Sequence, residues 1–77
     1  MNISQLRTLV TIADHKGFAD AAERLFITPA AVSQQMRALE EELQVQLFDR
    51  TTRPPHLNAH GVHIAERARD VLRTFDA

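Results

Sequence analysis

Apolar residues recur at every third or fourth position over the first part of the chain. They are Ile3, Leu6, Leu9, Val10 and Ala13. Because this spacing places them on one face of an amphipathic helix, it predicts a first helix over residues 3–14. Gly17 follows shortly after, and glycine readily takes the left-handed conformation that ends many helices. We therefore expect the Lys16-Gly17 pair to end this helix, with Gly17 as its left-handed cap.

Two further helices are predicted before residue 44. A short apolar stripe contains Phe18, Ala21, Ala22 and Leu25, and Phe26-Ile27 then breaks the helical register. Thr28 is a good first cap because its hydroxyl can accept a hydrogen bond from a free backbone N–H. Pro29 suits the first helical position, where its missing N–H costs nothing. The third helix should continue to about Leu43, with one apolar face formed by Val32, Met36, Leu39 and Leu43.

The pattern changes between residues 45 and 57. The apolar pair Leu47-Phe48 is followed by a polar turn that ends in Pro54-Pro55, which reads as extended backbone. These features predict a short two-stranded ribbon. Asn58 can cap a last helix that runs to the end of the chain. Its apolar stripe is close to heptad spacing and contains Ile64, Ala65, Ala68, Val71, Leu72 and Phe75.

The third helix should present a distinctive exposed face. At about 100° per residue, the face opposite Val32 carries Ala30, Ser33, Gln34 and Arg37. Small residues allow close approach to a groove, and the start of a helix attracts phosphate groups. Gln and Arg side chains can pair with adenine and guanine. A solvated helix face would explain the composition alone, but a short helix, a three-residue turn and a capped second helix form a helix-turn-helix arrangement.

The overall charge does not by itself indicate nucleic acid. The formal net charge is −1 and the isoelectric point is about 6.4, whereas DNA-binding domains are usually basic. DNA binding therefore requires an uneven distribution, with Arg37, Arg50 and Arg53 toward DNA. The acids that must then face elsewhere include Asp14, Asp20, Glu23, Glu40, Glu41, Glu42 and Asp49.

Several motifs together resemble a known family. They are FADAAERL at 18–25, TPAAVSQQMRALEEEL at 28–43, LFDR at 47–50 and LNAHG at 57–61. Their order and spacing resemble the amino-terminal domain of LysR-type transcriptional regulators. The resemblance implies a mainly α fold, a winged helix-turn-helix of three helices and a two-stranded wing, followed by a long linker helix for dimerisation. The implied division is a DNA-binding domain at 1–57 and a linker helix at 58–77.

The resemblance also implies the site residues and the partners. Double-stranded DNA would be contacted by Thr28, Pro29, Ala30, Ser33, Gln34, Arg37, Arg50 and Arg53. A second copy would be contacted by Ile64, Ala68, Val71, Leu72 and Phe75. The expected target is an inverted-repeat operator bound by a homodimer, with tetramers in the full-length protein. A small-molecule co-inducer is expected in a carboxy-terminal domain that this chain lacks, and no cofactor in this domain.

Three departures from the family pattern occur. The usual Gln-Pro at the start of the recognition helix is here Pro29-Ala30, and an Arg common after the Ser is here Gln34. These two changes predict an unusual operator sequence. The Gly usual after the third helix is here Gln44. Arg50 has two open roles, since it can contact DNA or brace the fold through Asp49 or an acid of the third helix.

Other classes of function are less well supported by the sequence. Catalysis is not expected, because Ser33 and Thr28 have no nearby histidine in the sequence. His56, His60 and His63 could hold zinc, but no carboxylate or thiol completes the set. A protein-interaction module without DNA contact remains the alternative, because the last helix has an apolar stripe. No cysteine, signal peptide or membrane-spanning stretch occurs, and we expect a cytoplasmic protein.

Overall fold

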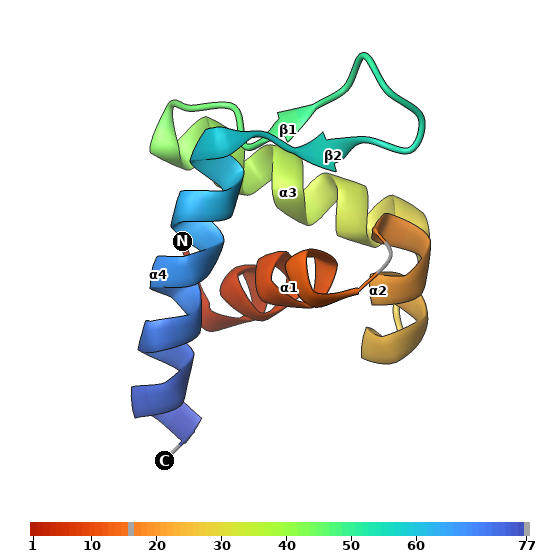
Figure 1. The fold of residues 1–77 in the computed structure, drawn as a ribbon. Coiled ribbons are helices and arrows are strands. Elements are labelled where there is room, and N and C mark those ends of the chain that lie inside the picture. The colour runs from red at the N-terminus through yellow and green to blue at the C-terminus, as the bar shows by residue number, and fades with distance from the viewer. Residues whose placement is uncertain (16, 77) are drawn as a thin grey trace.

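Four helices and one small antiparallel sheet make up the computed structural model, which describes residues 1–15 and 17–76 (Figure 1). In chain order the elements are α1 (Ile3–Asp14), α2 (Phe18–Leu25), α3 (Pro29–Leu43), β1 (Phe48–Asp49), β2 (His56–Leu57) and α4 (Ala59–Asp76). Strand β1 pairs with β2, with Phe48 opposite Leu57 and Asp49 opposite His56. The predicted fold class is therefore confirmed: three helices and a two-stranded wing, followed by a long helix.

Side-chain caps begin three of the helices. The Thr28 Oγ1 accepts from the Ala31 N–H at 3.0 Å, and the Asn58 Oδ1 accepts from the Gly61 N–H at 2.8 Å, so both predicted caps are confirmed. Helix α1 begins with a capping box, which was not predicted from the sequence. There the Asn2 Oδ1 accepts from the Gln5 N–H at 2.8 Å, and the Gln5 Oε1 accepts from the Asn2 N–H at 3.0 Å.

The end of α1 differs from the prediction. Helix α1 ends at Asp14, and its C-cap residue is His15 in an extended conformation with φ −131°. Lys16 lies outside the described residues. Gly17 has φ 94° and ψ −159° and stands directly before α2, so the prediction of Gly17 as a left-handed cap of the first helix was wrong. Glycine is still required here, because other residues rarely adopt this φ.

The left-handed caps occur at two other positions, and neither is a glycine. Phe26 ends α2 with φ 58°, and Gln44 ends α3 with φ 56°. The Gln44 Nε2 also donates to the Glu41 carbonyl at 2.7 Å. The turn after α3 thus has the geometry that glycine would give, although a side chain must occupy a strained region.

The core lies between α1, α2, α3 and the base of the wing. Its largest completely buried side chains include Leu9, Met36, Leu39, Leu47 and Phe48. Helix α4 joins this core through Ala65, and it packs on α1 through a second cluster of Leu6, Ala68 and Leu72. The first turn of α4 also lies against the wing base, because a Cβ on Gly61 would stand 2.1 Å from the Leu47 carbonyl oxygen.

Polar contacts fix α1 against both α3 and α4. The buried Thr8 Oγ1 lies 2.5 Å from the Gln35 Oε1 of α3. Toward α4, Asp14 accepts from Arg69 at 2.7 Å and Asp76 accepts from Arg7 at 2.8 Å. Helix α1 is therefore one of the elements that connect α4 to α3.

Candidate nucleic-acid interface

The two faces of α3 divide as the sequence predicted. Val32, Met36 and Leu39 are buried against the rest of the domain. On the other side, Thr28, Pro29, Ala30, Gln34 and Arg37 are exposed, and Ser33 is half-buried. The amino-terminal half of α3 thus presents short side chains together with one amide and one guanidinium group.

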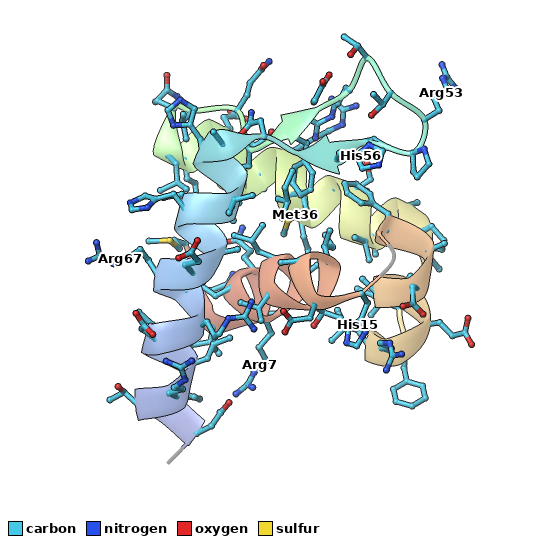
Figure 2. The ribbon with its side chains drawn as sticks, viewed as in Figure 1. Arg7, His15, Met36, Arg53, His56 and Arg67 are labelled. Atoms are coloured by element: carbon cyan, nitrogen blue, oxygen red, sulfur yellow. The ribbon has the colours of Figure 1, made fainter. Side chains whose placement is uncertain are left out.

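The wing projects beside α3 as a loop braced by its own side chains. The Asp49 carboxylate accepts from the Thr51 hydroxyl at 2.6 Å and from the Thr51 N–H at 2.9 Å, and these bonds hold the pKa of Asp49 below its ordinary value. Thr52 contacts the His56 Nδ1 at 2.8 Å. Arg53 is exposed at the outer end of this loop, away from the core (Figure 2).

Arg50 lies between the wing and α3. Its Nη1 donates to the Glu40 carboxylate at 2.9–3.0 Å, and its guanidinium carbon lies 5.7 Å from the centre of the Phe48 ring. The side chain is only 27 % exposed. The sequence left two roles open for Arg50, a contact with DNA or a contact that braces the fold. The structure shows a bracing contact, made with Glu40, an acid of the third helix.

An open crevice of about 290 Å³ separates α3 from the wing. Its two sides carry Ser33 and Arg37 from α3 and Thr52 and Arg53 from the wing, and Phe18, Arg50 and Pro55 line the rest. Hydroxyl and guanidinium groups, all of them hydrogen-bond donors, therefore converge on this crevice from two elements.

The arginines divide into those that pair with acids and those that do not. Five arginines pair with acids: Arg7 with Asp76, Arg24 with Asp20, Arg50 with Glu40, Arg69 with Asp14 and Arg73 with Asp70. Within residues 1–15 and 17–76, Arg37, Arg53 and Arg67 make no ion pair. Two of these three arginines flank the crevice, so the positive charges on its two sides are not neutralised by an ion pair within the described residues.

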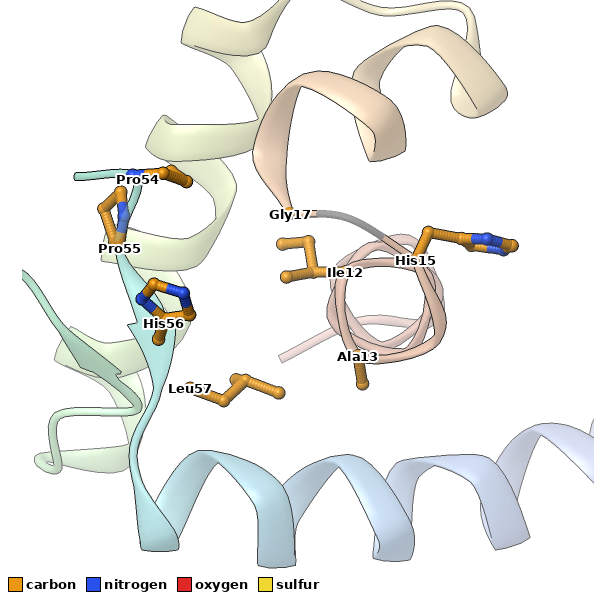
Figure 3. Close-up of a pocket in the computed structure, with 8 residues that line it drawn as sticks. All are labelled: Ile12, Ala13, His15, Gly17, Pro54, Pro55, His56 and Leu57. Carbon is orange, nitrogen blue, oxygen red and sulfur yellow. The ribbon is translucent and has the colours of Figure 1, made fainter. Parts of the chain in front are cut away.

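A second cleft, of about 360 Å³, lies between the end of α1 and the base of the wing (Figure 3). Its lining is largely apolar and includes Ile12, Leu57 and the two prolines of the wing. The His15 side chain points away from Ile12 and His56, so the two histidines do not share a ligand position. Among the residues that the structure describes, no group of three or more metal-ligating side chains occurs.

The predicted contact stripe of α4 divides into two parts. Ala68 and Leu72 are buried against α1 within the same chain, whereas Val71 is 48 % and Phe75 62 % exposed. Ile64 and Val71 line an open groove of about 310 Å³ beside α4, together with Met1, Leu6, Leu43, His63, Arg67 and Ala68. No helix in the described part of the chain is long and apolar enough to cross a membrane.

Similar proteins include regulators of transcription. The chain is 43 % identical over 72 residues to the HTH-type transcriptional activator AllS of Salmonella typhimurium, and this match covers 94 % of the chain and 23 % of the relative. The chain therefore spans about a quarter of the length of such relatives. The family is one of regulators, which confirms by comparison the expectation that the chain is not an enzyme.

Solved structures of two regulators match almost the whole chain. The BenM DBD in complex with catB site 1 DNA has a TM-score of 0.91 and 33 % identity, covering 99 % of this chain and 82 % of that one. The CbnR DBD in complex with DNA has a TM-score of 0.91 and 34 % identity, covering 99 % and 87 %. Residues 3–62 match the family described as bacterial regulatory helix-turn-helix protein, lysR family, and the chain belongs to that family.

Proposed function

We propose that this chain is the sequence-specific DNA-binding part of a bacterial transcription regulator. The recognition helix, residues 28–43, enters the major groove, and the wing, residues 50–56, contacts the adjacent backbone or minor groove. One observation carries the proposal: within the described part of the chain, the two arginines beside the α3–wing crevice, Arg37 and Arg53, have no ion pair, whereas most other arginines do.

The exposed face of α3 supports reading of bases. The N-terminal end of a helix carries partial positive charge, which suits phosphates. Ala30 and Ser33 are short enough to let this end sink into a groove. Gln34 and Arg37 then supply donors for base edges, and each good bidentate pair is worth about 1–3 kcal/mol of discrimination. Thr28 and Pro29 lie at the same end and complete the proposed contact surface.

The similar structures point the same way. The BenM and CbnR structures have nearly the same fold as this chain, and in both the DBD is in complex with DNA. A pure interaction module, the alternative function, gives no reason for an exposed Gln34 and unpaired Arg37 beside a wing. DNA binding is therefore the better account of the geometry.

The test is selection of bound duplexes from a random DNA pool, followed by titration of variants on a selected duplex and on a random one. Gln34→Ala and Arg37→Ala should each weaken binding to the selected duplex by roughly 1–3 kcal/mol and spare the random duplex. Arg53→Ala should weaken binding to both and lower the salt slope by about one unit. The matched control is Arg73→Ala, because Arg73 is exposed and paired with Asp70 on α4.

Failure of the chain to enrich any sequence, with no retention on heparin at low salt, would exclude this function. Equal losses for Gln34→Ala on the selected and random duplexes would show that this residue contacts phosphate only. Equal losses for Arg53→Ala and Arg73→Ala would remove the wing from the interface.

A homodimer is the proposed assembly, with a tetramer in the full-length protein. The exposed Val71 and Phe75 and the half-buried Ile64 continue the apolar stripe beyond the part that α1 covers. A second copy that covers this groove about a two-fold axis would place two recognition helices on one duplex, so the operator would be an inverted repeat. Ala68 and Leu72 would contribute to this surface only indirectly, because they pack on α1 of the same chain.

Val71→Asp tests the dimer without damage to the core. We expect the variant to sediment as a monomer and to lose affinity for an inverted-repeat duplex, because the two half-sites no longer bind together. Thr74→Asp introduces the same charge at an exposed position outside the groove and is the control. Monomeric wild-type chain with full affinity for a single half-site would refute the dimer.

The remaining proposals concern the whole protein. Residues 1–57 would carry DNA binding and residues 58–77 would serve as the linker helix, although α4 shares the core of the domain. No cofactor is proposed for this domain. A small-molecule co-inducer would bind a further domain, as the family resemblance implies, and the protein would act in the cytoplasm, where bacterial DNA lies. Full-length BenM matches this chain over 25 % of its own length, so a ligand screen needs the full-length protein.

A further inference from the structure

Glu40 is an acid on the recognition helix with an unusual number of contacts. Its Oε2 accepts from the Leu47 N–H at 2.8 Å and from the Phe48 N–H at 3.3 Å, at the start of the wing. The same carboxylate binds Arg50, and its side chain is only 10 % exposed. One carboxylate on α3 therefore holds both the backbone and a guanidinium of the wing.

Two aromatic rings connect Arg50 to α2. The Arg50 guanidinium lies over the Phe48 ring, and the Phe48 ring meets the Phe18 ring edge-on at 5.0 Å between centroids. The Arg50 Nη2 is buried and has no hydrogen-bond partner among the residues that the structure describes. Glu40 is the acid that compensates the charge of this partly buried guanidinium, so the position of Arg50 depends on Glu40.

The position of this ion pair relates it to the DNA-facing arginines. Arg50 lines the same crevice as Arg37 and Arg53. Arg37 is three residues before Glu40 on α3, and Arg53 is three residues after Arg50 on the wing. Glu40 and Arg50 therefore connect the two segments that carry the unpaired charges.

We propose that Glu40 is a positioning residue for DNA binding, which acts through Arg50 to fix the wing relative to the recognition helix. This inference rests on the proposed DNA-binding function. It assigns no DNA contact to Glu40 itself. Its role is to hold Arg37 and Arg53 at a fixed distance from each other. Both can then contact the same duplex without the entropy cost of ordering the wing when DNA binds.

Neutralisation of Glu40 should change the DNA affinity in the direction opposite to that expected for other acids near DNA. Removal of a negative charge near phosphates should strengthen binding, because repulsion is lost. For Glu40 the loss of wing position should exceed that gain, so its neutralisation should weaken binding. Glu41 provides the matched comparison, because it is the next residue on α3 and is exposed. Its side chain makes no hydrogen bond or ion pair within residues 1–15 and 17–76.

The experiment compares Glu40→Gln with Glu41→Gln in the 77-residue chain, on a duplex selected from a random pool by the wild-type chain. Glutamine can still accept from the Leu47 N–H, so the variant removes chiefly the charge that Arg50 requires. We expect Glu40→Gln to bind about tenfold more weakly, or about 1.4 kcal/mol, with a salt slope about one unit smaller as Arg53 loses its contact. Glu41→Gln should bind as tightly as the wild type or slightly more tightly.

Folding is measured in parallel, by circular dichroism at the temperature of the titration. A purely structural role would lower the melting temperature but leave the affinity and salt slope of the folded fraction unchanged. Should Glu40→Gln fail to fold, Arg50→Lys replaces it, because lysine keeps the charge but loses the planar guanidinium that lies over the Phe48 ring. The same loss of affinity and slope is expected.

Each outcome separates this inference from the function on which it rests. Wild-type chain that binds neither the selected nor a random duplex would overturn the DNA-binding function itself. Wild-type chain that binds, with Glu40→Gln and Glu41→Gln equally tight and of equal salt slope, would overturn the role of Glu40 alone.

Discussion

Gly61 offers a direct test of how α4 is docked, through the substitution Gly61→Ala. In most helix interiors this change stabilises a protein, because alanine has the better helix propensity by about 1 kcal/mol. Here the new Cβ would stand 2.1 Å from the Leu47 carbonyl oxygen and 2.7 Å from the Leu57 Cδ2. The first of these atoms is backbone, so it cannot move away as the end of a side chain could.

The expected loss follows from these contacts. Overpacking costs about 1–3 kcal/mol, and contact with backbone places this case at the upper end. The Leu47 carbonyl also accepts from the Asn58 N–H at 2.9 Å, and displacement of this bond costs about 1 kcal/mol more. After the gain in propensity, we expect Gly61→Ala to lower the free energy of unfolding by roughly 2–3 kcal/mol. For a domain of this size that is roughly 10–20 °C in melting temperature.

Thermal and urea unfolding followed by circular dichroism measure this loss. His60→Ala is the control, because His60 is exposed on the preceding position of the same helix turn, and its stability should stay within about 0.5 kcal/mol of the wild type. An increase in stability for Gly61→Ala would refute the reasoning, since it would mean that α4 does not approach Leu47 closely.

Three further changes probe single features of the fold. Thr28→Ala removes the cap of α3 and should lower the free energy of unfolding by about 1 kcal/mol in urea titrations, whereas an unchanged midpoint would argue against the cap. Phe26→Gly relieves a left-handed backbone at a side chain that is 94 % exposed, so the melting temperature should rise by a few degrees; a fall would show that the ring makes stabilising contacts. Burial acts to raise the pKa of Glu40, but Arg50 and two backbone N–H groups outweigh it and hold that pKa below its ordinary value. This contribution to stability is present at neutral pH and lost as the pH falls through the lowered pKa, so acid should destabilise the wild type more than Glu40→Gln.

Local signals in the sequence were sufficient for most of the fold. Thr28, Pro29 and Asn58 mark helix starts by chemistry that acts within one turn, and the apolar period gives the buried face of α3. The role of Gly17 was predicted wrongly, because a glycine between two helices can either end the first helix or precede the second. A left-handed Phe26 or Gln44 was not predictable from residue type, since glycine and asparagine are the residues that usually end a helix in that conformation.

The candidate site was predictable as a surface but not in its connections. The exposed face of α3 and the wing arginines followed from spacing and from the family resemblance. The pairing of Arg50 with Glu40 joins residues ten positions apart through a turn whose shape the sequence does not specify. In the same way, the apolar stripe of α4 could not be divided in advance between Leu72, which faces α1, and Val71, which faces outward.

The contacts of α1 have a mechanical consequence. Two ion pairs, Asp14 with Arg69 and Arg7 with Asp76, join α1 to α4, and Thr8 joins α1 to Gln35 on α3. A rotation of α4 would therefore be expected to move α1 with it and, through α1, to change the position of α3. Two copies joined along α4 would then set the spacing and tilt of their recognition helices by the angle between the two α4 helices, with no change inside either domain.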